Sequence, residues 1–392
     1  MDESIRRMER ALTVISADGP DADMADLAAR LGSAYYFAGD LDRSFDRTEQ
    51  ALEIAESLLL PDVLARSFIV KSFIADSRSR PEESLAFLNQ ALKVASEHDL
   101  ASTALRAHYN LAGASLQRDR HEDELEHLAE ALALARKNGD RVQEWMTVCE
   151  MTYPLYMLGR WEELLPALAE VPEEQLGRIG TLVSPLASVL QIHLHRGELN
   201  EASRLFNRFA ELDASKEVQA RAGYLCGAAA FFRATGRYAE ALQAGKEAIA
   251  SGEVLGSGSQ CVKQGFVEAA EAAFDLDERT ELEALLAGVE SLPPGRRPAY
   301  LEAHAVRFRA RLADAETDAR YSGAARLFRE FGTPFCLAVT LLEHGEWLAG
   351  SGRPAESERL LREAREIFER LGVRPWLERL DSSGEPEVVA AG

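Results

Sequence analysis

The residues that could carry chemistry are scattered along the chain. His193 and His195 are two residues apart, which places them on different sides of a helix, and His121 and His127 are six apart. The acidic run at residues 122–124 lies in the expected first turn of a helix, where carboxylates favour the helix dipole. None of these patterns has the spacing of a metal site or of a catalytic acid–base pair.

Motifs for phosphate binding and nucleophilic catalysis are also missing. Gly245 and Lys246 have no glycine-rich loop before them, so they do not form a phosphate-binding loop. The chain contains no GxSxG and no HExxH. Its four cysteines form no CxxC pair and are expected to be small buried apolar residues. The sequence therefore predicts a protein that is not an enzyme, with no catalytic residue, metal or cofactor.

The elements that carry these residues are expected to be helical repeats. The dipeptide Ala-Leu occurs at residues 11–12, 51–52, 91–92 and 131–132, always 40 residues apart. Self-similarity at such a period indicates a solenoid, in which each unit buries its apolar face against its neighbours.

One unit shows the order of features. Between residues 28 and 39, apolar side chains follow one helical stripe, Gly32 provides a small position for a helix crossing, and Gly39 ends the helix. Ser44, Thr48 and Ala51 then line the inner stripe of a second helix. This order is typical of tetratricopeptide repeats. HEAT repeats share the longer period without the order of small residues, and are the second choice.

The small position of Gly32 recurs along the chain at spacings of 36 to 41 residues. Its counterparts are Ser72, Ala112, Thr152, Leu190, Ala229, Ala270, Val306 and Gly345. The predicted fold is all-α, a right-handed superhelical solenoid of about nine tetratricopeptide-like helix pairs with a period of about 40 residues. The units at 266–292 and 299–333 fit the pattern least well.

These positions predict the domain organisation. Repeats 1–7 cover residues 24–292 and repeats 8–9 cover 299–372, separated by the proline-rich segment 293–298, which is either a loop or a bend of the superhelix. Residues 373–381 form a C-terminal cap, and 382–392 a disordered tail. Residues 1–18 match the second helix of a truncated repeat. We expect the chain to be cut from a larger protein, a complete gene being the alternative.

Composition limits the partners. The net charge of −21 disfavours nucleic-acid and anionic-membrane binding. No apolar run is long enough to span a bilayer, and the N-terminus lacks an apolar signal core. These features predict a cytoplasmic protein.

The surface that remains for function is the concave groove lined by first helices. Aromatic and arginine side chains at its expected positions suit a protein or peptide partner, because such residues dominate interface hot spots. The alternative is that the long units bury these aromatics between repeats. The candidate groove residues are Tyr36, Arg66, Phe73, Asp76, Arg106, Tyr109, Tyr153, Tyr156, Gln191, Arg233, Glu271 and Arg307.

The C-terminal quarter resembles a known family. The segments 321–335, 337–348, 364–372 and 375–379 are similar to the tail of actinobacterial-type signalling proteins. Those proteins combine a class III adenylate/guanylate cyclase domain, an AAA-like or STAND ATPase domain and a tetratricopeptide array, and LuxR-type ATP-dependent regulators have similar arrays. The resemblance implies that cyclase or ATPase residues would lie upstream of this chain.

Two functions follow as expectations. The first is a non-catalytic scaffold, the regulatory and protein-interaction module of a larger signalling ATPase or nucleotide cyclase. Its groove would bind a protein, a peptide or the parent's own ATPase domain. The alternative is a small-molecule effector sensor of a STAND-type transcriptional regulator. Self-association through surfaces around Trp347 or Trp376 also stays open.

Overall fold

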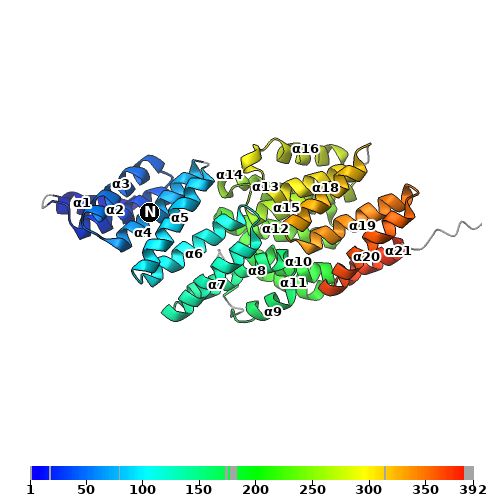
Figure 1. Ribbon diagram of the computed structural model, residues 1–392, viewed down its shortest axis with the longest axis horizontal. Helices are drawn as coiled ribbons and strands as arrows, with labels where there is room; N and C mark the ends of the chain where they lie inside the picture. The colour runs from blue at the N-terminus through cyan, green and yellow to red at the C-terminus, as the bar shows by residue number, and fades with distance from the viewer. Residues whose placement is uncertain are drawn as a thin grey trace, which may run out of the picture. The chain divides into compact units, whose positions relative to one another are not determined.

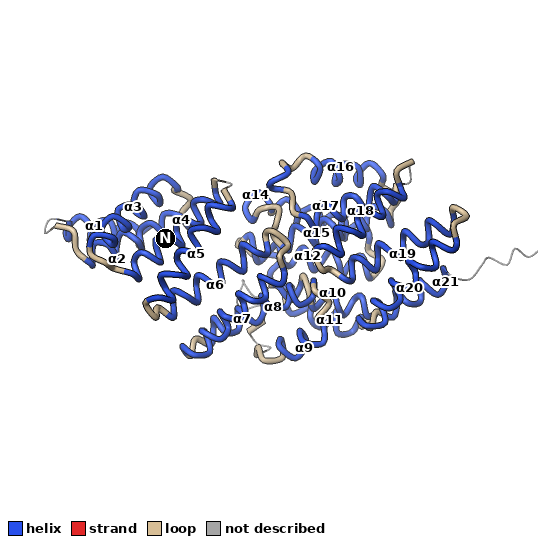
Figure 2. The backbone as a smooth tube through the Cα atoms, in the orientation of Figure 1, coloured by secondary structure: helices blue, strands red, loops and turns tan. Residues whose placement is uncertain are grey.

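The computed structural model describes residues 2–16, 19–78, 80–172, 175–176, 183–312 and 315–383. Across these ranges the chain is built of helices joined by short turns and contains no strand (Figures 1 and 2). Successive helices run antiparallel in pairs, which confirms the predicted all-α helical-repeat solenoid. No described helix is both long and apolar enough to cross a membrane.

The chain divides into two compact units. Unit 1 comprises Met1–Ala114 and Glu126–Thr147, and unit 2 comprises Ser115–Leu125 and Val148–Gly392. The helices that contribute to unit 1 are α1 (Asp2–Ile15), α2 (Ala22–Phe37), α3 (Leu41–Ser57), α4 (Pro61–Ser77), α5 (Pro81–Glu97), α6 (Ala101–Leu116), α7 (His121–Asn138) and α8 (Arg141–Met157).

Unit 2 begins with residues of α6, α7 and α8 and continues to the C-terminus. Its further helices are α9 (Trp161–Leu168), η2 (Ser184–Leu186), α10 (Val189–Arg196), α11 (Leu199–Arg208), η3 (Ala210–Ala214), α12 (Val218–Ala234), α13 (Tyr238–Ala250), α14 (Gly252–Leu255), α15 (Gln260–Asp275), α16 (Arg279–Glu290), η4 (Pro294–Arg296), α17 (Ala299–Arg311), α18 (Thr317–Glu330), α19 (Pro334–Gly350), α20 (Pro354–Leu371) and α21 (Arg374–Ser383).

Small residues let the helices of a pair cross closely. In the α2–α3 pair, Ser44 Oγ donates to the carbonyl of Gly32 at 2.8 Å, and Ser44, Thr48 and Ala51 are fully buried. The same contact recurs near the other end of the chain, where Ser357 Oγ on α20 donates to the carbonyl of Gly345 on α19 at 2.8 Å. The repeat phase predicted from Gly32 therefore holds in both units.

A side chain at Gly32 is expected to destabilise unit 1. A Cβ there would collide with Thr48 Oγ1 and lie 3.3 Å from Thr48 N, so Gly32→Leu should lower the free energy of unfolding by about 1–3 kcal/mol through overpacking. Urea denaturation measures the change. Gly113→Ala is the matched control, because no atom lies within 4 Å of a Cβ at that helical glycine. Equal stability of wild type and Gly32→Leu would contradict the packing.

The least regular part of the solenoid lies early in unit 2. Helices α9 and α10 have eight residues each, and Pro154 and Pro166 lie inside α8 and α9. Residues 266–292 overlap α15 and include α16, and residues 299–333 include α17 and α18.

The two ends of the chain carry single helices. α1 packs on α2, where Tyr35 Oη donates to Glu9 Oε1 at 2.8 Å. α21 covers the last pair, and its Trp376 stacks on Phe368 at 5.8 Å between ring centroids. The predicted cap at 373–381 thus coincides with a helix that extends to Ser383. Of the predicted tail, residues 384–392 lie outside the described ranges.

Candidate partner-binding surface

The first helices α2, α4 and α6 present neighbouring side chains on one side of unit 1. Asp26 on α2 pairs with Arg66 on α4, and Tyr36 on α2 contacts Phe73 on α4. On α6, Thr103 Oγ1 donates to Asp62 Oδ1 of α4 at 2.8 Å. We call this surface the unit 1 face. Its residues are Asp26, Tyr36, Phe37, Asp62, Arg66, Phe73, Asp76 and Arg106.

One end of the unit 1 face carries three aromatic rings, the aromatic cluster. Tyr36 and Phe73 have ring centroids 5.2 Å apart, and Phe37 lies 5.3 Å from Tyr36 and 6.3 Å from Phe73. Phe37 is 61% exposed, whereas Tyr36 and Phe73 are half-buried. Helical spacing predicted Tyr36 and Phe73 but missed Phe37. Phe37 is the last residue of α2, and a large apolar residue at the end of a first helix is the pattern that could have indicated it.

The other end of the face carries charges. Arg66 pairs with Asp26 and, through Nε, with Asp62 at 3.0 Å, and Arg30 pairs with Asp26 at 2.7 Å. Burial alone would raise the pKa of Asp26, but the Arg66 and Arg30 guanidinium groups outweigh it and lower the pKa below its usual value. Arg66 thus forms ion pairs with two carboxylates, those of Asp26 and Asp62.

Arg106 differs from Arg66, its counterpart one repeat earlier. Its side chain is exposed, and within the described ranges no hydrogen bond or ion pair engages its guanidinium. Although its relative accessibility is high, neighbouring side chains partly desolvate the Arg106 guanidinium; this desolvation, and then the nearby Arg66 cation, lower the pKa of Arg106, while the Asp62 carboxylate acts in the opposite direction. Among the other predicted residues of unit 1, Asp76 is exposed and accepts a hydrogen bond from Ser84 Oγ at 2.8 Å, and Tyr109 is half-buried.

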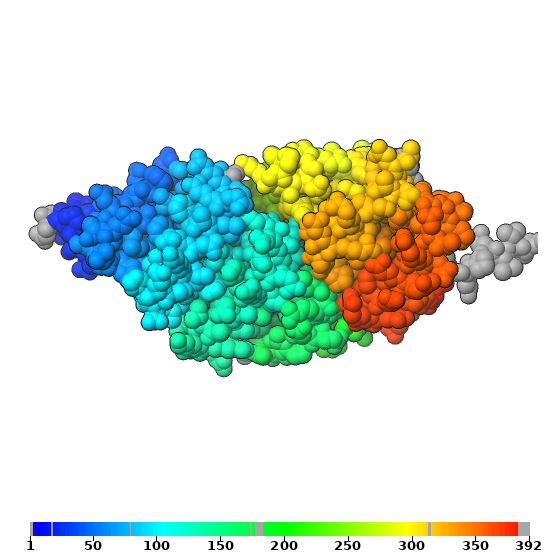
Figure 3. Space-filling view, viewed as in Figure 1, coloured from blue at the N-terminus to red at the C-terminus, as the bar shows by residue number. Residues whose placement is uncertain are grey.

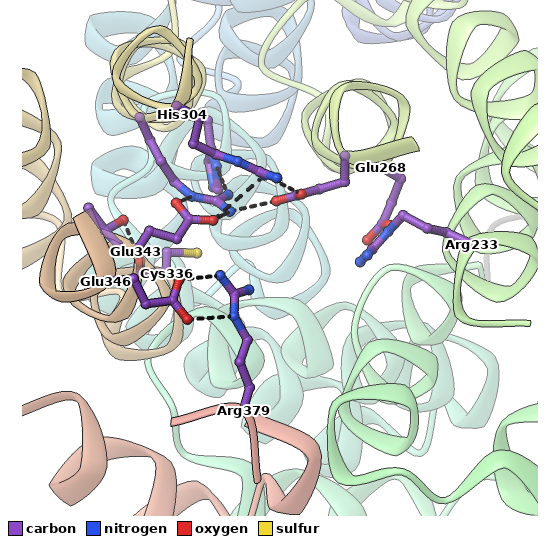
Figure 4. A network of polar contacts seen from close by, with 11 residues as sticks. Arg233, Glu268, His304, Cys336, Glu343, Glu346 and Arg379 are labelled. Carbon is purple, nitrogen blue, oxygen red and sulfur yellow. Dashed lines mark hydrogen bonds and ion pairs between the residues drawn. The ribbon is translucent and has the colours of Figure 1, made fainter. Parts of the chain in front are cut away.

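The inner side chains of unit 2 form an alternating charge ladder, one helix after another (Figure 4). Arg307 on α17 pairs with Glu271 on α15 and with Glu343 on α19, both at 2.6 Å. The sequence separation is 36 residues in each case. The ladder consists of Arg233, Glu268, Glu271, Arg307, Glu343, Glu346 and Arg379, from α12, α15, α17, α19 and α21.

The ladder neutralises its own charges. Burial would raise the pKa of Glu271, but Arg307, Arg311 and Arg233 hold it well below the ordinary value. Burial would likewise lower the pKa of Arg307, but Glu343 and Glu271 raise it. Of the predicted groove residues, Arg233 and Glu271 are half-buried within this ladder, and Arg307 is buried.

The other predicted groove residues of unit 2 are buried as well, which corrects the expectation that they face an open groove. Tyr153, Tyr156 and Gln191 have exposed fractions of 0%, 5% and 1%. The physical reason is that other helices of unit 2 cover these side chains: Tyr153 contacts His121 and Lys263, and Tyr156 contacts Trp161 and His195. α10 contacts α21, and Figure 3 shows the red C-terminal surface against the green surface of residues near 200.

Aromatic rings close this contact. The ring centroids of His195 on α10 and Phe335 on α19 are 4.0 Å apart, and those of Trp376 on α21 and Phe335 are 5.5 Å apart. On the other side, Trp161 stacks on Tyr156 at 5.8 Å, and Tyr156 Oη lies 3.3 Å from His195 Nε2. The alternative of buried aromatics therefore describes unit 2.

Acidification is expected to destabilise unit 2 through His195. Burial among these rings, and then Arg233, lower the pKa of His195 to about 3, whereas an unfolded histidine has a pKa of about 6.5. Because the unfolded chain binds the proton first, stability is lost as the pH falls below about 6.5, by up to about 1.4 kcal/mol per pH unit. His195→Phe should flatten this slope in urea denaturation at about pH 7 and about pH 5. Exposed His98→Gln is the control, and equal slopes for His195→Phe and wild type would refute the assignment.

A second buried polar cluster joins the α6–α7 turn to α15. Lys263 Nζ donates to Asp119 Oδ1 at 2.7 Å and to the Leu116 carbonyl at 3.0 Å, and both charged side chains are almost completely buried. The backbone N–H of Tyr300 donates to Asp119 Oδ2 at 2.8 Å. His121 Nδ1 lies 2.9 Å from Glu124 Oε2 nearby, and burial raises the pKa of Glu124.

None of these clusters has the donor set of a metal centre. In the part of the chain that the structure describes, no group of three or more His, Cys, Asp or Glu side chains is placed to hold a metal ion. The four cysteines are free and buried, and burial raises the pKa of the Cys336 thiol to about 12. What the described side chains of unit 1 present is an exposed aromatic and charged surface, the unit 1 face.

Comparison with known proteins identifies the type of fold. No protein-family model and no curated protein matches the chain. It is similar to NprR, the quorum sensor from B. thuringiensis, in complex with its cognate peptide NprX, with a TM-score of 0.55 and 13% identity over 84% of this chain and 93% of that one. It is also similar to a monomeric variant of human IFIT1 with m7Gppp-AAAA, with a TM-score of 0.50 and 14% identity over 93% and 86%. These likenesses show a helical-repeat fold.

Proposed function

We propose that this chain is a non-catalytic interaction module that binds a peptide, or an extended segment of a partner protein, on the unit 1 face. The observation that carries the proposal is the exposed aromatic cluster of Tyr36, Phe37 and Phe73. Large aromatic side chains that remain accessible on a first-helix surface are typical anchors of protein interfaces. The structure of NprR with its peptide NprX supports a peptide as the ligand of this type of fold.

Unit 2 is less suited to this role. Its inward positions are occupied by the charge ladder and the aromatic closure, so an incoming peptide would have to displace ion pairs that already satisfy one another. We therefore assign binding to unit 1 and a structural role to the inner surface of unit 2.

Panning a library of short random peptides against the full chain tests the proposal. Affinities of the selected peptides are then measured by fluorescence anisotropy for wild type, Phe37→Ser and Val14→Ser. Phe37 is exposed, so its substitution should weaken binding at least about tenfold without unfolding the chain. Val14, which is 72% exposed on α1, is the matched apolar control. Selected peptides that bind Phe37→Ser as tightly as wild type would refute the assignment.

We further propose that the module regulates a larger signalling ATPase or nucleotide cyclase, to which its peptide segment could belong. The resemblance of residues 321–379 to the arrays of such proteins supports this. The reading frame upstream of codon 1 tests it. A cyclase or ATPase domain encoded there would agree with the proposal, and an unrelated upstream gene would contradict it.

A small-molecule effector is the second candidate function, favoured by one cavity in unit 2. This cavity of about 270 Å³ has Val289, Ala305 and Val306 in its lining, together with Arg297, Arg309 and Arg320. However, Arg309 is already paired with Glu283 and Glu290. Thermal-shift screening against metabolites separates the two functions, because only an effector would raise the melting temperature in the absence of peptide.

A further inference from the structure

The charges and apolar side chains of the unit 1 face indicate which class of peptide it would bind. Its charged end contains two arginines in equivalent positions, Arg66 and Arg106. The first is neutralised by Asp26 and Asp62. For the second, the described residues supply no ion pair and no hydrogen bond to the guanidinium. This end of the face therefore presents one cation with its hydrogen-bonding capacity unused.

An arginine in this setting favours a carboxylate ligand. The guanidinium offers donors in a planar fork that match the two oxygens of a carboxylate. Arg66 stands close enough to Arg106 to affect it electrostatically, so an added negative charge would relieve the repulsion between the two cations. The nearby carboxylates of Asp26 and Asp62 are already held by Arg66, which limits their repulsion of an incoming acid.

The aromatic end has the opposite preference. Phe37 offers an exposed apolar surface beside Tyr36 and Phe73. Asp76 lies one helical turn beyond Phe73 on α4 and is exposed, so this end disfavours a second acid. A ligand should thus place its carboxylate at Arg106 and an apolar side chain on the aromatic cluster.

The separation of the two ends sets the spacing within the ligand. Phe73 is seven residues beyond Arg66, the counterpart of Arg106, which is a rise of about 10 Å along α4. The step from α4 to the packed neighbour α6 adds about 9 Å sideways. The diagonal of about 14 Å corresponds to about four residues of extended chain.

Resting on the proposed function, we infer that the unit 1 face selects an extended acidic peptide. Its aspartate or glutamate binds Arg106, and an aromatic or large aliphatic residue about four positions away packs on Tyr36, Phe37 and Phe73. The carboxylate fixes the register and the apolar residue supplies most of the affinity.

A charge reversal at Arg106 tests this inference on the full chain. Peptides selected by wild type are remade with glutamate, glutamine or lysine at the acidic position, and their affinities are measured for wild type, Arg106→Glu and Lys93→Glu. We expect wild type to prefer glutamate over lysine by at least about tenfold, and Arg106→Glu to reverse that order. Lys93 is exposed on α5, so Lys93→Glu is the control that changes the net charge by the same amount away from the unit 1 face.

The outcomes separate the inference from the proposed function. Peptides that depend on Phe37 but bind equally well with glutamate, glutamine or lysine would overturn the acidic-peptide inference and leave the proposed function standing. An equal loss in Arg106→Glu and Lys93→Glu would also overturn it, since net charge alone would then explain the effect. Peptides that bind independently of Phe37 would overturn the proposed function itself. Circular dichroism confirms that each variant is folded.

Discussion

Replacing Lys263 by methionine is expected to lower the free energy of unfolding by about 3–5 kcal/mol, one of the two largest effects of a single substitution in this chain. The Lys263 side chain is fully buried, and its ammonium group holds Asp119 Oδ1 and the Leu116 carbonyl. Methionine fills a similar volume without the charge. Among the described residues, Asp119 would then be a buried anion that keeps a hydrogen bond from the Tyr300 backbone N–H but has lost its cation, and an uncompensated buried charge is costly.

The double variant Lys263→Met with Asp119→Asn separates charge from packing. Asparagine can still accept the Tyr300 N–H, and it tolerates the positive φ of 57° at position 119. Urea denaturation of the double variant should therefore recover most of the lost stability. Lys246→Met is the control, because its ion pair with Glu281 is exposed and should contribute less than about 1 kcal/mol. If the double variant stays as unstable as Lys263→Met, lost packing rather than the bare charge is the cause.

The repeat architecture could be predicted from sequence because its cause is local. Gly32 and Gly345 must be small where a second helix crosses, and Ser44 and Ser357 complete the same hydrogen bond in both places. Such a requirement recurs with the period of the repeat, so it is visible in one sequence. The irregular helices α9 and α10 were not foreseen, because they follow from contacts with distant helices such as α21.

The predicted groove residues differ in their exposure between the two units for the same reason. A position-based template identifies which side of a first helix faces inward, and it placed Tyr36, Phe73 and Arg106 on the unit 1 face. It does not contain the curvature of the array. In unit 2, contacts between helices far apart in the sequence bury inward residues, such as Tyr153 against His121 and Lys263, and Gln191 on α10, the helix that also contacts α21.

The sequence contains a pattern that could have predicted the charge ladder. Arg307, Glu343 and Arg379 are spaced by 36 residues with alternating sign. Taken singly they are ordinary surface charges of a helix. Only the repeat register puts them beside one another, where opposite signs in successive repeats pair across neighbouring helices. Alternation of charge at the repeat period is therefore a pattern that predicts a closed inner surface rather than a ligand groove.

Arg307→Met carries the other large expected loss of stability, about 3–5 kcal/mol. The Arg307 side chain is 3% exposed and bridges Glu271 and Glu343, which are 14% and 5% exposed. Without it, the ion pairs left to the two carboxylates among the described residues are those with Arg311, whose Nη1 lies 2.5 Å from Glu271 but 3.6 Å from Glu343. Burial then raises the free energy of the incompletely paired anions.

Removing a carboxylate together with the arginine should reverse much of that loss. In Arg307→Met with Glu343→Leu, Glu271 keeps Arg311 and the second buried charge is gone, so urea denaturation should show a smaller deficit than in Arg307→Met alone. Arg362→Met, which breaks an exposed pair with Glu358, should change stability by less than about 1 kcal/mol. Additive losses in the double variant would mean that the two side chains act independently. The ladder would then be a row of separate contacts rather than one coupled network of charges.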